Sequence, residues 1–294
     1  MEGRRQIRLI EDFATSRDSG RPFVRRFFLL VRGLYTSASG ALVAESMVDN
    51  VANNLANVNT SGFKQTLLQV QSAPTLDIYR IQTDPGKTAT GALSGVPVAQ
   101  AVGLLGTGSQ VYDTPTSFEQ GPIRQTGNPL DLAITGNANA FFTIQTPNGV
   151  RYTRDGEFAE DGQGILRTRD GNTVLSTQGT QIQLQNQGAV TIGKDGTVFQ
   201  NGQVVAQIQL TQFNSLLNLR PEGANNYVPS GNAGPSPTTT ASVQQGALEA
   251  SNANVVRSMV DLITAERWFD ANEKSIKTQD DATNTAISQV AKTS

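Results

Sequence analysis

The residues most able to do chemistry in this chain are carboxylates that lie in or beside Asp-Gly turns. Asp155, Glu157, Glu160 and Asp161 follow one another closely, and their oxygens suit a metal cation. None of these aspartates begins the D-x-[DN]-x-[DN]-G spacing of a calcium loop. Glu157 and Asp170 could form the carboxylate pair of a glycosidase, but nothing in the sequence singles them out. Because hairpin turns explain the same residues, we predict no catalytic residue and no metal site.

The amino-acid composition removes most other reaction types. The chain has neither histidine nor cysteine, which excludes His-based triads, thiol nucleophiles, disulfides and metal sites built on imidazole or thiolate. Gly103–Gly108 (GLLGTG) lacks the Lys-Ser/Thr ending of a phosphate-binding loop, so we interpret it as linker. Trp268 and Phe269 could form a ligand platform, but helix packing explains them better. We therefore expect a non-enzymatic protein without cofactors.

The charge balance argues against a nucleic-acid partner. Lysine and arginine number 23 and aspartate and glutamate 25, so the net charge is −2 and the chain has no basic excess. The longest early apolar run, Phe27–Val31, is too short for a signal-peptide core or a membrane span. We expect no membrane insertion, and any export must use a route without a cleaved signal peptide.

The first part of the chain differs in composition from the rest. Residues 1–32 carry eight arginines and no lysine. They are either a basic targeting arm or additional residues from an upstream translation start. We predict that residues 1–30 form a non-native or disordered extension.

Both ends of the remaining chain show helical periodicity. From Leu34 to Val58 the residues of one stripe recur in steps of four and three, and Asn57–Gly62 supplies residues that end helices. A second heptad pattern starts at Leu248 and continues for about forty residues, longer than a usual globular helix, which favours a coiled coil. Each helix therefore offers a stripe that needs a partner.

The middle of the chain has a different period. Residues 130–210 contain short β-like runs separated by Asn-Gly and Asp-Gly pairs such as Asn148-Gly149 and Asp195-Gly196. These pairs favour tight hairpin turns, so we predict an antiparallel β domain here. The expected fold class is α+β, with the β domain inserted into a discontinuous helical core domain formed by residues 31–65 and 243–294. Residues 66–129 and 211–242 are expected to be connecting segments.

Three motifs, in order along the chain, resemble the bacterial flagellar axial proteins, which are the rod and hook subunits. Arg32–Lys64 contains the N-terminal signature, with Asn53-Asn54-Leu55-Ala56-Asn57 and Gly62-Phe63-Lys64 as its most specific parts. Ile134–Phe158 is similar to the central rod motif and includes the run Tyr152-Thr153-Arg154-Asp155-Gly156. Gly246-Ala247-Leu248-Glu249-Ala250-Ser251-Asn252, followed by Met259, Glu266 and Asn272, is similar to the C-terminal signature.

This resemblance implies the remaining expectations. Family members pack their terminal helices as an antiparallel coiled coil that lines a helical tube, with the β domain outside it. The implied function is that of a flagellar basal-body rod subunit, proximal or distal, which transmits torque from motor to hook. The implied partners are copies of the chain, other rod and hook subunits, and the flagellar type III export apparatus. The implied location is the basal body in the cell envelope, reached without a cleaved signal.

The resemblance and the heptad stripes together give the predicted site residues. The subunit-assembly residues are Leu34, Ala38, Ala41, Val48, Ala52, Asn53, Asn54, Leu55, Asn57, Leu248, Asn252, Val255, Met259, Leu262, Phe269 and Ile276. The asparagines either bond between subunits or cap the helix end. Phe63 and Leu67 resemble the spacing by which rod and hook subunits engage the export gate. The alternative functions are an envelope enzyme that acts on cell-wall glycan and an extracellular adhesin-like β protein.

Overall fold

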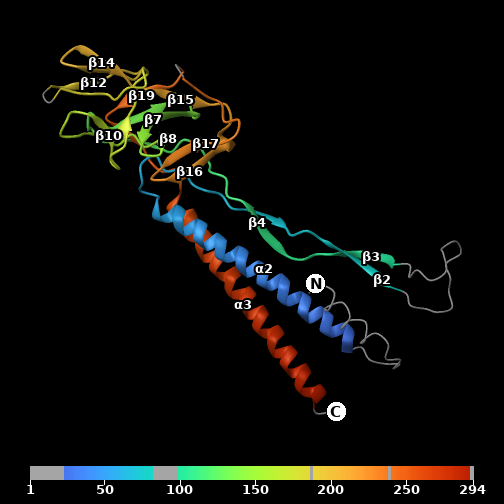
Figure 1. The fold of residues 1–294 in the computed structure, drawn as a ribbon. Coiled ribbons are helices and arrows are strands. Elements are labelled where there is room, and N and C mark those ends of the chain that lie inside the picture. Colours follow the sequence, from blue (N-terminus) through green and yellow to red (C-terminus); the bar gives the residue numbers. More distant parts are fainter. Residues whose placement is uncertain (1–22, 82–98, 186–187, 238–239, 292–294) are drawn as a thin grey trace, which may run out of the picture. The chain divides into compact units, whose positions relative to one another are not determined.

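The computed structural model describes residues 23–81, 99–185, 188–237 and 240–291. Within these residues, strands β1–β20 lie between two long helices in the chain order, α2 (Phe23–Ala56) and α3 (Val255–Ala291) (Figure 1). The fold class is therefore α+β, as the sequence predicts. The chain divides into a larger unit, Val43–Gln71 with Val111–Arg267, and a smaller unit, Met1–Leu42 with Ser72–Gln110 and Trp268–Ser294.

The larger unit is built on an antiparallel sheet of nine strands. Its main path runs β16, β17, β8, β7, β11, β10, β9, while β15 pairs with both β7 and β18. The strands are β7 (Ala140–Thr146), β8 (Gly149–Thr153), β9 (Phe158–Glu160), β10 (Leu166–Thr168), β11 (Thr173–Val174), β15 (Leu210–Phe213), β16 (Leu219–Gly223), β17 (Asn226–Pro229) and β18 (Pro235–Pro237). Tight turns connect β7 with β8 and β16 with β17, and β7 and β8 pair from Phe142↔Thr153 to Thr146↔Gly149.

Smaller sheets complete the strand inventory. The pairs are β6 (Leu132–Thr135) with β19 (Ser242–Gln245), β5 (Ile123–Gln125) with β20 (Ala247–Glu249), β1 (Gln69–Ser72) with β4 (Ser109–Asp113), and β2 (Leu76–Ile81) with β3 (Ala99–Leu105). A three-stranded sheet contains β12 (Val190–Ile192), β13 (Thr197–Gln200) and β14 (Gln203–Gln207). A 3-10 turn, η1 (Leu216–Asn218), precedes β16.

The sheet extends beyond the predicted limits of residues 130–210. The segment 211–242, expected to be a connection, supplies β16, β17, β18 and most of β15. The reason is an aromatic cluster that the sequence reasoning missed: Phe213 and Tyr227 from this segment pack with Phe141 of β7 and with Phe118, all buried. Their rings meet edge to face, with Phe141 and Phe213 centroids 5.6 Å apart, an arrangement that aromatic quadrupoles favour.

The main core lies under the same sheet. It is formed by buried apolar side chains from β6, β7, β9–β13, β15 and β19 and from the segments that connect them. Its largest members are Leu132, Ile134, Phe142, Ile144, Phe158, Leu166, Ile182 and Ile208. The alternation of apolar and polar residues in the predicted β runs places these side chains on one face.

The two helices contact each other through small and polar residues. In the smaller unit, the hydroxyls of Ser37 and Ser275 lie 3.0 Å apart, and a Cβ at Gly40 would lie 2.8 Å from the side-chain oxygen of Asn272. A Cβ at Gly33 would lie 2.7 Å from that of Gln279. Moving forward along α2 therefore moves backward along α3, so the helices run antiparallel.

The C-terminal helix begins later than the sequence predicted. Asn254 caps α3, because its side-chain oxygen accepts the Arg257 N–H at 3.0 Å. Leu248 and Asn252, which we placed on the helix, lie before it, and Leu248 belongs to β20. Leu248 happens to match the heptad spacing, but it is buried by strand pairing with β5. Of the predicted extension, residues 1–22 lie outside the described residues, and the rest, from Phe23, belongs to α2.

Neither α2 nor α3 is apolar enough along its described residues to cross a membrane.

Candidate functional site

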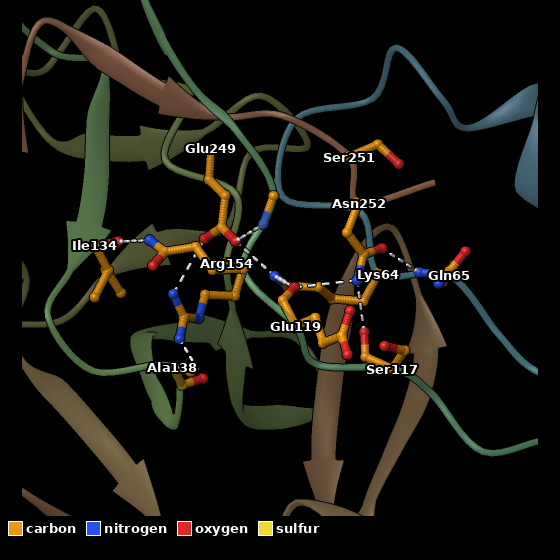
Figure 2. Close-up of polar contacts among 12 residues, drawn as sticks. Lys64, Gln65, Ser117, Glu119, Ile134, Ala138, Arg154, Glu249, Ser251 and Asn252 are labelled. Atoms are coloured by element: carbon orange, nitrogen blue, oxygen red, sulfur yellow. Dashed lines mark hydrogen bonds and ion pairs between the residues drawn. The ribbon is translucent and has the colours of Figure 1, made fainter. Parts of the chain in front are cut away.

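The three signature motifs meet at one buried carboxylate in the larger unit. The Lys64 ammonium donates to Glu249 Oε1 at 2.5 Å, and Arg154 Nη1 lies 3.1 Å from Glu249 Oε2. All three side chains are at most 1% exposed. Figure 2 shows Lys64 and Arg154 both directed toward the Glu249 carboxylate. We call Lys64, Arg154 and Glu249 the ionic junction.

Hydrogen bonds to the backbone also hold the three side chains of the ionic junction. Glu249 Oε1 also accepts the Gly121 N–H at 3.0 Å, and Lys64 Nζ also donates to the Glu119 carbonyl at 2.7 Å. Arg154 Nη2 donates to the carbonyls of Asn137 and Ala138. Charged groups can stay buried only with such partners, because an unpaired buried charge costs several kcal/mol.

The electrostatics of the ionic junction reflect its burial. Two cations share one carboxylate, so the junction keeps a net positive charge. Burial lowers the pKa values of Lys64 and Arg154, and the attraction of Glu249 opposes this effect. Arg154 also lies over the ring of Phe141, with its guanidinium carbon 5.1 Å from the centroid, and the negative ring face offsets part of the excess charge.

Backbone contacts bring the motifs close enough for the ionic junction. The Gly62 N–H donates to the Glu249 carbonyl at 2.7 Å. Gly62 has φ +68°, and a Cβ there would lie 2.4 Å from the backbone nitrogen of Asp155. Only glycine accommodates both the left-handed conformation and this approach. The Asn252 amide accepts the Gln65 N–H at 2.8 Å and donates to two nearby carbonyls.

A polar cleft of about 780 Å³ lies beside the ionic junction in the larger unit. Asp155, Glu157 and Asp170 all line it, together with Arg169, whose guanidinium lies 3.8 Å from Glu157. The pKa of Asp155 is raised to about 6, chiefly by burial and to a smaller extent by the nearby charges of Glu157 and Asp170. Across the described residues, no group of three or more acidic side chains is placed to hold a metal ion.

The predicted assembly residues on the helices lie beside the contact line of α2 with α3. In α2 the predicted stripe is shifted by one residue from the contacting Gly33, Ser37 and Gly40, and Leu34 is 38% exposed. Ala38, Ala41, Val48 and Leu55 are half-buried, and Ala52 is exposed. In α3, Val255, Met259 and Phe269 are exposed, while Leu262 and Ile276 are half-buried. Ala44 and Val51 of α2 and Ser258 and Ala265 of α3 are buried.

Some predicted assembly residues have partners within the chain. Asn54 is buried, and its amide donates to the Thr66 carbonyl at 2.8 Å and accepts the Thr66 N–H at 2.9 Å. Asn57 donates to the Asn53 carbonyl at 2.9 Å at the end of α2, so it acts as a helix cap. Asn53 is exposed.

The two residues predicted to engage the export gate differ in burial. Phe63 is buried and Leu67 is 48% exposed. Phe63 is therefore accessible only when this part of the chain is unfolded.

The ionic junction was not predicted from the sequence, although its three residues stand inside the three signature motifs. Glu249 stands between Leu248 and Ala250, an apolar context that indicates a buried pair in a chain in which only 16% of residues are charged. Lys64 and Arg154 have polar or charged neighbours and carry no such signal, so the sequence did not show which charges meet.

Family models match three parts of the chain. Residues 34–64 match "Flagella basal body rod protein", residues 133–200 match "Flagellar hook protein FlgE/F/G D1 domain", and residues 244–289 match "Flagellar basal body rod FlgEFG protein C-terminal". Each model contains one residue of the ionic junction.

Curated relatives cover most of the chain. A flagellar basal-body rod protein FlgF from Caulobacter vibrioides is 35% identical over 260 residues, which are 88% of this chain and 98% of the relative. A flagellar basal-body rod protein FlgG from Bacillus subtilis is 34% identical over 268 residues, 86% of this chain and 96% of the relative. A FlgG from Borreliella burgdorferi is 32% identical over 265 residues, 85% and 96%.

Proposed function

The chain belongs to the family of flagellar basal-body rod proteins, and on this premise we propose that its copies stack into a helical tube that transmits torque from the motor to the hook. A structural subunit of the rod acts by binding its neighbours. Head-to-tail contacts that do not close into a ring generate such a filament. The partners are copies of the chain and other rod and hook subunits.

The observation that carries the proposal is the distribution of apolar side chains on α3. The helix contacts α2 in the smaller unit through polar residues, Asn272 and Ser275 among them. Its large apolar residues near the start of the helix stay exposed, including Val256 at 72%, Val260 at 57% and Ile263 at 51%. Exposed apolar side chains in such a group are typical of protein–protein contact sites.

The same contacts support a proposal for the finer architecture. We propose that α2 and α3 form an antiparallel coiled coil and that the β domain is inserted between them in the chain. The steps of four and three along Gly33, Ser37 and Gly40 support the coiled coil. The predicted assembly stripes, which remain partly exposed beside this contact line, then face neighbouring subunits.

Export through the flagellar type III apparatus is a second part of the proposal. Phe63 is buried in the folded larger unit, so it can engage the export gate only on an unfolded chain. The exposed Leu67 offers the better test, because Leu67→Ala removes little buried surface. We expect this variant to be exported in smaller amounts at unchanged stability, and normal export would exclude Leu67 from the gate signal.

Neither alternative function gains support from the comparisons. A glycan-acting enzyme would require the carboxylates of the polar cleft to act on a substrate, whereas the family models that match this chain are those of rod and hook proteins. An adhesin-like protein would not need the terminal helices.

Electron microscopy of purified basal bodies tests the proposed function. Basal bodies from a strain that lacks this gene are compared with those from the complemented strain. We expect a missing or truncated rod without a hook, and the point of truncation distinguishes a proximal from a distal position. Intact rods that carry hooks in the deletion strain would overturn the proposal.

A further inference from the structure

The segment around Glu249 comes late in the chain but lies among the central contacts of the larger unit. The Glu249 carbonyl accepts the Gly62 N–H at 2.7 Å, and the Ala250 N–H donates to the Pro122 carbonyl at 2.9 Å. A Cβ at Gly121 would lie 2.0 Å from the Ala250 carbonyl oxygen. Residues from two separate parts of the chain, Gly62 and Gly121 with Pro122, therefore enclose this segment, and Glu249 is 1% exposed.

Glu249 also supplies the negative charge that offsets the buried positive charges of Lys64 and Arg154. Lys64 and Arg154 belong to motifs that precede it by most of the length of the β domain. Without Glu249, their cationic groups keep only uncharged partners, the carbonyls of Glu119, Asn137 and Ala138 and the ring of Phe141. Two like charges brought into a dry interior without a counter-ion oppose compaction strongly.

We propose that Glu249 acts as a latch. The loop around Lys64, residues 61–67, stays undocked until Glu249, in the C-terminal motif of the same chain, arrives and pairs with Lys64 and Arg154. A chain that emerges N-terminus first, from the ribosome or from an export channel, presents Lys64 and Arg154 long before Glu249. The larger unit then docks its N-terminal motif only when almost the whole chain is present. The usefulness of such a latch rests on the proposed function, because an exported rod subunit has to stay unfolded in transit.

Several backbone amides report docking without bonding to Glu249. The Leu67 N–H donates to the Pro115 carbonyl at 2.8 Å, and the Ser117 N–H donates to the Gln65 carbonyl at 2.8 Å. These two amides become protected from solvent exchange when the loop docks. The Ala250 N–H reports arrival of the latch segment, and the Thr143 N–H, bonded to the Gln209 carbonyl at 3.1 Å, reports the core sheet.

Pulse-labelled hydrogen exchange during refolding of the full-length chain tests the latch. In the unmodified protein, Leu67 and Ser117 should gain protection together with Ala250. In Lys64→Met, which removes the loop's buried cation and keeps an apolar chain of similar length, Leu67 and Ser117 should gain protection before Ala250. The proposal is wrong if the amides of Leu67 and Ser117 gain protection before that of Ala250 in the unmodified protein. It is also wrong if Lys64→Met leaves the order of protection unchanged.

Native-state exchange of a second pair of variants separates a charge effect from loss of packing. Glu249→Gln keeps the size and the acceptor but removes the charge, and should lower the protection of Leu67 and Ser117 at least about tenfold. Glu222→Gln is the matched control, because Glu222 pairs with Arg151 and its side chain is 39% exposed. Equal effects of the two substitutions would overturn the proposal. These measurements need no flagellum, so their failure leaves the rod assignment intact, whereas hooked basal bodies in the deletion strain would leave the latch intact.

Discussion

Asp155 is the residue whose protonation most plainly affects the stability of the larger unit. Burial raises the pKa of this carboxyl group from 3.8 to about 6, although its oxygen accepts the Glu157 N–H at 3.1 Å. The folded state therefore holds the proton more tightly than the unfolded state. Its contribution to stability is complete below about pH 4 and is lost as the pH rises through 6.

We predict that Asp155→Asn removes this pH dependence. The amide keeps the hydrogen bond to Glu157 but cannot ionise. Between pH 4 and pH 7.5, the unfolding free energy of the variant should therefore rise relative to that of the unmodified protein by up to about 2–3 kcal/mol. Urea unfolding of both proteins at the two pH values measures the difference. A gap in unfolding free energy that stays constant with pH would show that Asp155 ionises normally in the folded protein.

Gly62 connects the N-terminal motif to the β domain through backbone contact. Gly62→Ala should destabilise the larger unit by at least about 3 kcal/mol, because the new Cβ combines a left-handed φ with a collision against the Asp155 backbone. Gly202→Ala is the matched control: Gly202 has φ +77° and open space around its Cβ position. The control should cost only about 1 kcal/mol in denaturant unfolding. Similar losses for the two variants would mean that conformation alone, and not close approach, requires glycine at residue 62.

At the scale of elements, the helices use different residues for different partners. Within the chain, α2 and α3 meet at glycine residues and through the side chains of serine, asparagine and glutamine. The outward face of α3 carries Val256, Val260 and Ile263 near its start and changes to charged residues such as Lys274 further along. The apolar part of this face is the surface that assembly can bury.

We predict that Val260→Asp separates folding from assembly. Val260 is 57% exposed, so the unfolding free energy should change by less than about 0.5 kcal/mol. Burying the new charge against a neighbouring subunit is costly, so motility and hook-bearing basal bodies should be lost. Lys274→Asp places the same side chain on the charged part of the same face and should have a much smaller effect. Normal motility of the Val260→Asp strain would remove this face from the assembly surface.

At the scale of the whole molecule, the two units differ in what stabilises them. The larger unit has an extended apolar core and an aromatic cluster. In the smaller unit the described helix contacts involve polar and small side chains, which bury little apolar surface. Local stability therefore differs along the chain.

This difference predicts uneven hydrogen exchange in the isolated subunit. Amides of residues 37–42 and 270–279 should exchange at least about a hundredfold faster than those of Phe142 and Ile144, which lie in the central strand β7. Native-state exchange measured residue by residue tests this, with the protected strand amides as the internal reference. Equal protection in the two sets would show that the helices are as stable alone as the sheet.

The sequence by itself determined the features that depend on neighbouring residues. The heptad steps predicted long helices at both ends, and the Asn-Gly and Asp-Gly pairs predicted antiparallel strands between them. The three signature motifs identified the family, which the comparisons confirmed. These predictions succeeded because helix periodicity and turn chemistry act over a few residues.

Only the tertiary structure decided which distant residues meet. Periodicity marked a stripe on α2, but the contact with α3 lies one residue away, because Gly33 and Gly40 let the backbones approach more closely than larger side chains would. Leu248 fitted a heptad and became a strand residue. The ionic junction joins residues 64, 154 and 249, whose pairing has no local signal. Burial turned these separate charges into one site, since the low dielectric of the interior requires each of them to find a partner.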